Sequence, residues 1–263
     1  MTTTLVRLLC FLGMLVLMCL WEHCAPFRDP QPRPYRRWLS HGGLLAIGTA
    51  VMRLVPGFSA LAVASINRWG LCHQLALPEW LGILLTVVVL DLAVYGHHVV
   101  FHRYPPLWRI HQVHHADLHF DTTTGLRFHP LELLLSMLWK MIVVALLGSP
   151  VLGVLIYEVA LNATALFNHG NVRLPGILES LLRPVVVTPD WHRVHHSSRL
   201  EDTNSNYGSI FSWWDRLFGT YRATAQGSTI GLEHYRDPQQ TQQLGWMLML
   251  PFLPLPQKHC SEP

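Results

Sequence analysis

Residues 80–102 read WLGILLTVVVLDLAVYGHHVVFH, an apolar run that ends in two histidines four positions apart. An apolar run of about 20 residues is long enough to cross a bilayer as a helix. On such a helix His98 and His102 lie on one face, one turn apart, so that their imidazoles can share a metal ion. The stretch therefore predicts a membrane-spanning helix that carries a metal site at the membrane surface.

Two other regions extend this pattern to a multi-pass membrane protein. Residues 4–21 are apolar enough to span, and we expect a retained anchor rather than a signal peptide because no small-residue cleavage site follows them. Residues 131–168 predict a hairpin of two apolar helices divided by the turn at 148–150. Lys140 and Glu158 lie inside this hairpin, where ionisable side chains usually face protein or water.

Two further apolar stretches are less regular. Residues 42–66 are interrupted by Arg53 and Pro56, which predicts either one kinked span or two shorter pieces, with Arg53 reaching toward the membrane surface. Residues 245–255 contain prolines, so we expect them to lie at the membrane interface. The fold class is therefore an all-α membrane protein with about four to five transmembrane helices.

The composition agrees with a membrane protein. Only 13% of the residues are charged, whereas soluble domains carry about 25%. The net charge is +3 without any Lys/Arg-rich run, which argues against a nucleic-acid partner. The five cysteines have no CxxC spacing, so neither a disulfide framework nor a thiolate metal site is expected. They are Cys10, Cys19, Cys24, Cys72 and Cys260.

Arginines in the connecting loops predict the orientation in the membrane. The loops at 22–41 and 102–130 hold several arginines, whereas the loop at 67–79 holds only Arg68. The N-terminus would then lie outside, and every histidine cluster would lie on the cytoplasmic side. The arginines of the first two loops are Arg28, Arg33, Arg36, Arg37, Arg103, Arg109 and Arg127.

Histidines outnumber Asp and Glu together, 17 to 16, and two further clusters share the form HxxHH. This spacing places three imidazoles along one helical face, and the adjacent pair diverges by about 100°, so one cluster can serve two metals. A single histidine, His169, follows the hairpin. Nine imidazoles suit two first-row metals, and Fe, Zn, Cu and Ni all accept imidazole. The clusters are His111, His114 and His115, and His192, His195 and His196.

The remaining histidines lack such spacing. His97, His119 and His234 are interpreted as ordinary residues or as residues that support a ligand. His129 stands in the sequence Arg-Phe-His-Pro and either orients a ligand or binds metal directly.

The ordered motifs resemble those of the fatty acid hydroxylase/sterol desaturase superfamily, which are integral-membrane, histidine-rich di-iron oxygenases. The resemblance covers roughly residues 80–222. It rests on the histidine clusters and on four further stretches, RFHPLE at 127–132, NHGN at 168–171, TPDWHRVHHS at 188–197 and NSNYGSIFSWWDRLFGTY at 204–221.

The resemblance implies a membrane bundle of four helices capped by a cytosolic helical domain, with two non-haem Fe ions. It divides the chain into an anchoring region (1–79), a catalytic domain (80–222) and a tail with an interfacial segment (223–263). Some members have a further HxxxH pair where this chain has His169 and then Arg173. That departure leaves the ligand count open and favours the sterol-desaturase-like and alkane-hydroxylase-like variants. The implied ligands are His98, His102, His111, His114, His115, His169, His192, His195 and His196.

A polar group follows the last cluster closely. These side chains either hold the N–H groups of ligand imidazoles or cap a loop through Asx turns, and the sequence leaves both interpretations open. Trp213, Trp214 and Asp215 are interpreted as a packing turn. The polar residues are Asp202, Asn204, Asn206 and Tyr207.

These features together predict an enzyme that hydroxylates a lipid (a sterol, fatty acyl chain or related molecule) with O₂. Desaturation shares the first chemical step and is the alternative. Because no GxGxxG, haem CxxCH or ferredoxin cysteine pattern is present, electrons would come from an external reductase, ferredoxin or cytochrome.

A membrane zinc hydrolase is less favoured because nine histidines exceed the three that catalytic zinc needs. A metal transporter is less favoured because its ligands would lie at mid-membrane. Zn can still occupy an imidazole site in place of Fe.

Overall fold

The computed structural model describes residues 2–29, 31, 35–55, 57–227 and 229–254. Within these residues the chain forms helices and no β-strand, which confirms the all-α prediction. In chain order the elements are α1 Thr3–Cys24, α2 Tyr35–Arg53, α3 Ala60–Ile66, α4 Leu71–Gln74, α5 Glu79–Arg103, α6 Pro105–His115, η1 Thr122–Leu126, α7 Pro130–Leu147, α8 Val151–Asn168, α9 Gly176–Leu182, α10 Pro189–His195, α11 Leu200–Thr203, α12 Trp213–Leu217, α13 Pro238–Thr241, α14 Leu244–Met249 and η2 Leu250–Phe252.

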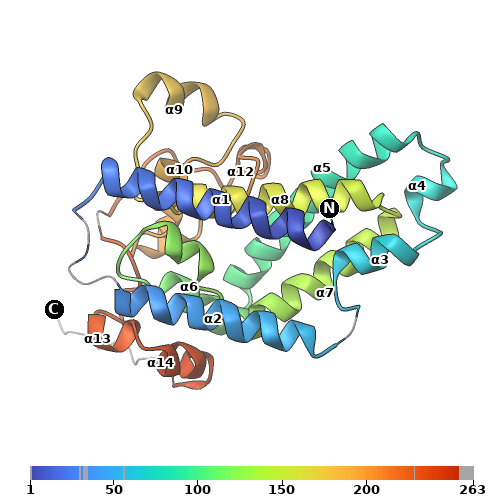
Figure 1. Ribbon diagram of the computed structural model, residues 1–263. Helices are drawn as coiled ribbons and strands as arrows, with labels where there is room; N and C mark the ends of the chain where they lie inside the picture. The colour runs from blue at the N-terminus through green and yellow to red at the C-terminus, as the bar shows by residue number, and fades with distance from the viewer. Residues whose placement is uncertain (1, 30, 32–34, 56, 228, 255–263) are drawn as a thin grey trace.

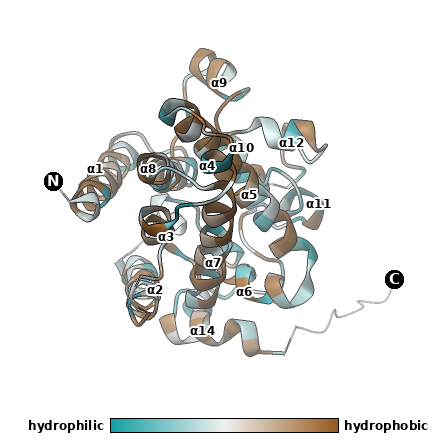
Figure 2. Ribbon diagram, turned by 90° about the vertical axis from the view of Figure 1, so that its right-hand side faces the viewer, coloured by the Kyte–Doolittle hydropathy of each residue, from teal (hydrophilic) through white to brown (hydrophobic). Residues whose placement is uncertain are grey.

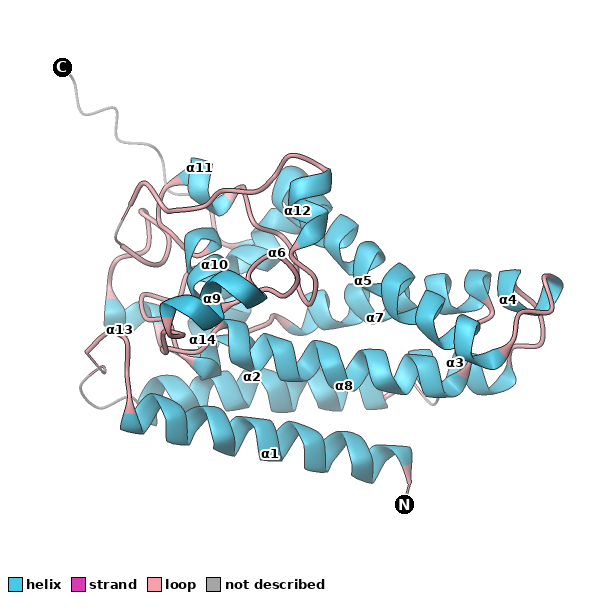
Figure 3. Ribbon diagram, turned by 90° about the horizontal axis from the view of Figure 1, so that it is seen from above, coloured by secondary structure: helices cyan, strands magenta, loops and turns pink. Residues whose placement is uncertain are grey.

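Four helices of the described chain are long and apolar enough to cross a membrane, namely α1, α5, α7 and α8. They are the spans that the hydropathy pattern predicts. These helices run side by side in Figure 1, and α7 is brown along its length in Figure 2. Seen from above, the short helices and loops of α6 and α9–α13 gather at one end of the bundle, with α3 and α4 at the other (Figure 3).

The irregular stretch 42–66 forms two pieces, which decides between the two interpretations left open. The first piece, α2, begins at Tyr35 and ends at Arg53, and the second is the short helix α3. Pro56, which was expected to interrupt the stretch, lies outside the described residues. α2 is not among the candidate spans, because the polar residues of its first half make the helix less apolar than the four spans; two of these residues, Arg37 and His41, are buried.

Arg37 was counted among the loop arginines that set the orientation, and this assignment was wrong. It lies in α2 and is fully buried, with ion pairs of 2.9 Å to Asp117 and 2.6 Å to Asp121. The side chain thus fixes α2 to the segment that follows α6 and is not a loop charge. Arg33, from the same predicted loop, lies outside the described residues.

The C-terminal apolar stretch packs on the protein and does not form a span. Its described part forms α14 and η2, where Met247 and Leu250 are fully buried. These side chains pack in a cluster with Leu44 of α2 and Val113 of α6. The tail therefore closes the end of the bundle beside α2 (Figure 1). The end of this stretch and Cys260 lie outside the described residues.

The hairpin of α7 and α8 turns at glycine and packs closely on α5. Gly148 adopts a left-handed conformation with φ of 68°, which glycine accepts without steric cost. At Gly153 of α8, a Cβ atom would lie 2.9 Å from the Cβ of Thr86 and 3.2 Å from the Cα of Ile83. Small residues allow such close approach between membrane helices. The contact sets how near α8 lies to α5, which carries the first two histidines.

We predict that Gly153→Ala destabilises the protein by about 1–3 kcal/mol, because the methyl group meets α5 atoms that cannot rotate away. Gly96→Ala in α5 is the matched control, since a Cβ there meets no atom within 4 Å. The control should be neutral or slightly stabilising, because alanine favours helix. Unfolding of both variants in mild detergent measures the difference. Equal midpoints for the two variants would show that the α5–α8 contact is not tight.

Candidate metal centre

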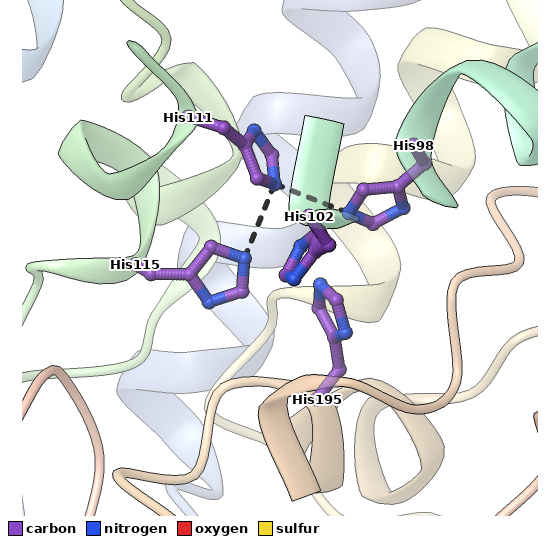
Figure 4. Close-up of side chains that lie close together, drawn as sticks. All are labelled: His98, His102, His111, His115 and His195. Atoms are coloured by element: carbon purple, nitrogen blue, oxygen red, sulfur yellow. Dashed lines mark hydrogen bonds between the residues drawn. The ribbon is translucent and has the colours of Figure 1, made fainter. Parts of the chain in front are cut away.

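The structure brings nine histidines, far apart in sequence, into two adjacent groups. In each group the nitrogen atoms that could bind metal lie within 4.8 Å of one another. Figure 4 shows the five rings of the first group pointing toward a common centre. The first group is His98, His102, His111, His115 and His195, and the second is His114, His169, His192 and His196.

Four elements supply these side chains. α5 supplies two from its last two turns and α6 supplies three. α10 supplies His192 and His195, and His196 is its C-cap residue, while His169 caps the end of α8. The adjacent rings of each HxxHH cluster divide between the groups, since His114 and His115 point to different centres. The groups are in contact, because the ring centroids of His115 and His196 lie 4.6 Å apart. Two metal ions held here would therefore be close neighbours.

Most of the rings are oriented by a bond on the side away from the centre. In five of them Nδ1 faces an oxygen acceptor, so that Nε2 points inward. The pairs are His98 with the carbonyl of Tyr207 (2.8 Å), His102 with Oδ1 of Asn204 (3.3 Å), His111 with Oε1 of Glu132 (2.7 Å), His169 with the carbonyl of Ala165 (2.7 Å) and His195 with the carbonyl of Ser205 (2.7 Å).

The Nε2 atoms that point inward lie so close to one another that they favour a bound cation. When Nδ1–H of His98 donates to a carbonyl and that of His111 donates to a carboxylate, both Nε2 atoms present lone pairs. Yet these two Nε2 atoms lie 3.1 Å apart. In the second group Nε2 of His169 lies 3.1 Å from Nε2 of both His114 and His192. Facing lone pairs repel, and a metal ion between them removes the repulsion.

Burial keeps the rings outside the membrane helices neutral, which is the form that binds metal. It lowers the pKa of His111 to about 3 and that of His169 to about 4. It also places the pKa of the remaining α6 and α10 rings well below the usual range. Among the described residues, the buried Nε2 atoms of His102 and His195 have no hydrogen-bond partner.

The spacing of the nitrogens also fits a metal. With metal–nitrogen bonds of about 2.1 Å, adjacent ligands of an octahedral ion are roughly 3.0 Å apart. The 3.1 Å between Nε2 of His111 and Nε2 of both His98 and His115 matches this separation. The nine residues therefore fit two metal ions, although imidazole alone does not name the element.

The four polar residues that follow the last histidine cluster have two different roles. Asn204 contacts His102 through its side chain, and Tyr207 contacts His98 through its backbone carbonyl. Asp202 and Asn206 do not reach a histidine. Asp202 binds Ser197 and the amides of Gln226 and Gly227, and the Asn206 amide binds two backbone carbonyls. Asn204 and Tyr207 therefore match the first interpretation. Asp202 and Asn206 instead hold loops through residues that are mostly distant in sequence, and none of these contacts is an Asx turn.

The loop that carries these carbonyls is held by two buried aspartates. Asp215 accepts hydrogen bonds from the amides of Tyr207 and Gly208, at 2.7 and 2.8 Å. Asp91 of α5 accepts from the indole of Trp214 at 2.9 Å and from the amides of residues 210 and 211. The predicted packing turn at 213–215 thus also positions the carbonyl that orients His98.

His129 and the other isolated histidines lie outside both groups. His129 caps α7, since its Nδ1 accepts from the amide of Leu131 and its Nε2–H donates to the carbonyl of Leu248. His97 contacts the hydroxyl of Ser136 at 3.3 Å. Neither side chain is placed to bind the metals, and His234 is exposed. His129 acts indirectly, by fixing the start of the helix that carries Glu132.

Glu132 is the contact that the sequence analysis missed. It is a buried carboxylate in the first turn of α7, and its Oε1 accepts the Nδ1–H of His111. A signal was present, because Glu132 ends the stretch RFHPLE and stands at the start of an apolar membrane helix. The carbonyls of Ala165 and Ser205 had no such signal, since every residue carries a backbone carbonyl.

We predict that Glu132→Gln lowers metal affinity about 10- to 100-fold, the usual effect of removing a partner that orients a ligand imidazole. The amide keeps the shape of the side chain but removes the negative charge that strengthens His111 as a ligand. Metal content after dialysis against a graded series of chelator concentrations measures the change. Unaltered retention of metal at every chelator concentration would contradict a role for this contact.

A cavity of about 240 Å³ leads from the histidines into the membrane bundle. It reaches rings of both groups and runs between α5, α7 and α8, with Phe11 of α1 and Leu45 of α2 on its wall. Two lining side chains, Trp139 and Asn162, are also exposed on spanning helices. The cavity therefore extends from the histidines toward the outer surface of the spanning helices.

The fold and the site define a membrane protein with a histidine-rich centre that could hold metal. The family model described as fatty acid hydroxylase matches residues 83–220, more than half of the chain. The protein belongs to the fatty acid hydroxylase family, a membrane-bound family within the superfamily that its motifs resemble. No solved structure is significantly similar to it.

Named relatives act on several lipids. The chain is 28% identical to "Ornithine lipid hydroxylase OlsE" of Rhizobium tropici, over 80% of this chain and 65% of that protein. It is 26% identical to human "Alkylglycerol monooxygenase", over 73% of this chain and 43% of that protein. It is 29% identical to "Delta(7)-sterol-C5(6)-desaturase" of Nicotiana tabacum, over 68% of this chain and 66% of that protein. The chain thus spans between two fifths and two thirds of these relatives.

Proposed function

We propose that this protein is a membrane lipid hydroxylase that uses O₂ at a centre of two non-haem irons. The observation that carries the proposal is the pair of adjacent groups of buried imidazoles, whose inward nitrogens face one another beside a membrane cavity. Relatives named hydroxylase and monooxygenase support it. The ligands are the nine histidines of the two groups.

Two iron ions, when bound, supply the reductive activation of O₂ that an unactivated C–H bond requires. The chain's own residues hold and orient the site. Glu132, Asn204 and the loop carbonyls keep five rings in the orientation that points Nε2 inward. The cavity wall, with Leu126, Phe128 and Leu133, excludes water and positions a lipid chain beside the histidines.

The electron donor and the sidedness also belong to the proposal. The chain has no sequence motif for flavin, haem or iron–sulfur binding, so a separate reductase, ferredoxin or cytochrome supplies electrons. Arg103 ends α5, Arg109 lies in α6 and Arg173 follows α8, whereas Arg68 lies between α3 and α4. Figure 3 places α6 at one end of the bundle and α3 and α4 at the other. This distribution supports a centre on the cytoplasmic side, where a soluble donor has access.

A desaturase is the second candidate because one relative carries that name. The two reactions give different products from labelled oxygen. Hydroxylation places one ¹⁸O atom in the lipid, whereas desaturation removes two hydrogens and leaves the lipid unlabelled.

The test uses the full chain in nanodiscs of membrane lipid, with iron, a reductase system and ¹⁸O₂. Mass spectrometry of the extracted lipids should find a product with one ¹⁸O atom that requires both reductant and O₂. The matched control is the same protein after chelation of iron. An unlabelled product lighter by two hydrogens would favour the desaturase, and no O₂-dependent product with any lipid fraction would contradict an oxygenase.

A further inference from the structure

The cavity beside the histidines contains a polar part that the metal centre does not use. Lys140 of α7 and Asn162 of α8 line it, together with Ser136. Lys140 and Asn162 make no side-chain hydrogen bond or ion pair within the described chain. Lys140 is half-buried and Asn162 is exposed. A lysine on a membrane-spanning helix usually faces protein or water, so a lysine without a direct partner beside this cavity indicates that a ligand pairs with it.

This polar part lies at a defined distance from the metal ligands. Glu132, Ser136 and Lys140 recur every four residues on α7, so they share one face of the helix and all line the cavity. At 1.5 Å per residue, Lys140 lies about 12 Å along α7 from Glu132, which holds His111. A molecule bound at Lys140 would therefore need a further part that extends along the cavity to reach the histidines.

The charges near the polar part leave one positive charge in excess. Glu158 of α8 is buried and lies 3.3 Å from Arg7 of α1 in an ion pair. Lys140 has no carboxylate within 4 Å among the described residues. The two cations, Arg7 and Lys140, and the one anion, Glu158, have a net charge of +1. Since Arg7 is 33% exposed and does not line the cavity, the excess charge belongs to Lys140.

We propose that Lys140 binds an anionic group, a carboxylate or a phosphate, of the lipid substrate. An ammonium without a direct partner at membrane depth is costly, and an anion in the cavity would offset that cost through charge-assisted hydrogen bonds. Asn162 of α8 lines the same cavity. The inference deepens the proposed function: it names an acidic lipid as the substrate and Lys140 as the residue that selects it.

Binding can be measured without turnover. The probe is cis-parinaric acid, a fluorescent fatty acid, compared with its methyl ester on the metal-loaded full chain in detergent. We expect the acid to bind about tenfold more tightly than the ester, the effect of one charge-assisted contact. Lys140→Met should remove that difference, and Lys140→Arg should retain it. Metal content and melting temperature of both variants show whether the fold and the centre persist.

Competition identifies the anionic group. Displacement of the probe by oleate points to a carboxylate, and displacement by oleoyl lysophosphatidic acid points to a phosphate. Equal affinity for acid and ester, a preference that survives in Lys140→Met, or displacement by neither competitor would overturn the inference. Its failure is distinct from that of the proposed function. A protein that oxidises neutral lipids without any acid preference would refute only the inference, whereas selective acid binding without oxidation would refute only the proposed function.

Discussion

His192→Ala and His195→Ala are each expected to abolish lipid oxidation while removing a different metal. The two residues lie three positions apart on α10, yet His192 belongs to the four-histidine group and His195 to the five-histidine group. Loss of one imidazole removes a ligand from one histidine group and leaves the other group complete. Metal per chain should therefore fall from two toward one in each variant, and activity should fall to background because the proposed reaction needs both ions.

The matched control is His234→Ala, since His234 is exposed and lies outside both groups. It should retain wild-type metal content and activity. Metal analysis of the three purified variants, together with O₂-dependent product formation, gives the comparison. If His192→Ala or His195→Ala kept both metals and full activity, that histidine would not be a ligand and its group would need another.

Arg37→Met is expected to destabilise the protein by about 3–5 kcal/mol, the usual effect of leaving one partner of a buried ion pair alone. Although burial raises the pKa of Asp117, the nearby Arg37 guanidinium holds it well below its usual range. Asp117 is 1% exposed, so without Arg37 its charge would be poorly compensated by Arg127, 3.9 Å away, and the hydroxyl of Thr124. Asp117 lies two residues after His115, the last histidine of the α6 cluster, so the metal centre should loosen with the fold.

Two further variants separate charge from packing. Arg37→Lys keeps the charge but cannot contact Asp117 and Asp121 with one planar fork, so it should recover only part of the stability. Arg37→Met combined with Asp117→Asn should be more stable than Arg37→Met alone, because no unpaired charge remains. Thermal or denaturant unfolding in mild detergent measures all three. A loss below about 1 kcal/mol for Arg37→Met would show that the ion pair is not structural.

The membrane spans and the histidine clusters could be predicted because their signals are local. An apolar run long enough for a membrane helix, or three histidines at positions i, i+3 and i+4, can be recognised from a short stretch of sequence without knowledge of distant contacts. The same spacing predicts that one HxxHH cluster serves two centres, and His114 and His115 divide in this way.

The surroundings of the histidines depend on contacts between distant residues and were harder to predict. Arg37 is 80 positions from Asp117, and nothing near Arg37 distinguishes a buried arginine from a loop arginine. The carbonyls of Tyr207 and Ser205 orient rings although their side chains play no part in that contact. Asp202 and Asn206 were grouped with Asn204 because they are close in sequence, yet only Asn204 reaches a ring.

The most direct test of the dimetal centre is the iron content of the full-length protein purified from iron-replete cells, combined with Mössbauer spectroscopy. Nine imidazoles in two adjacent groups predict two irons per chain, both bound mainly by nitrogen and close enough to interact magnetically. A protein that folds normally but binds at most one metal per chain, or binds zinc only and takes up no iron on reconstitution, would contradict the di-iron centre.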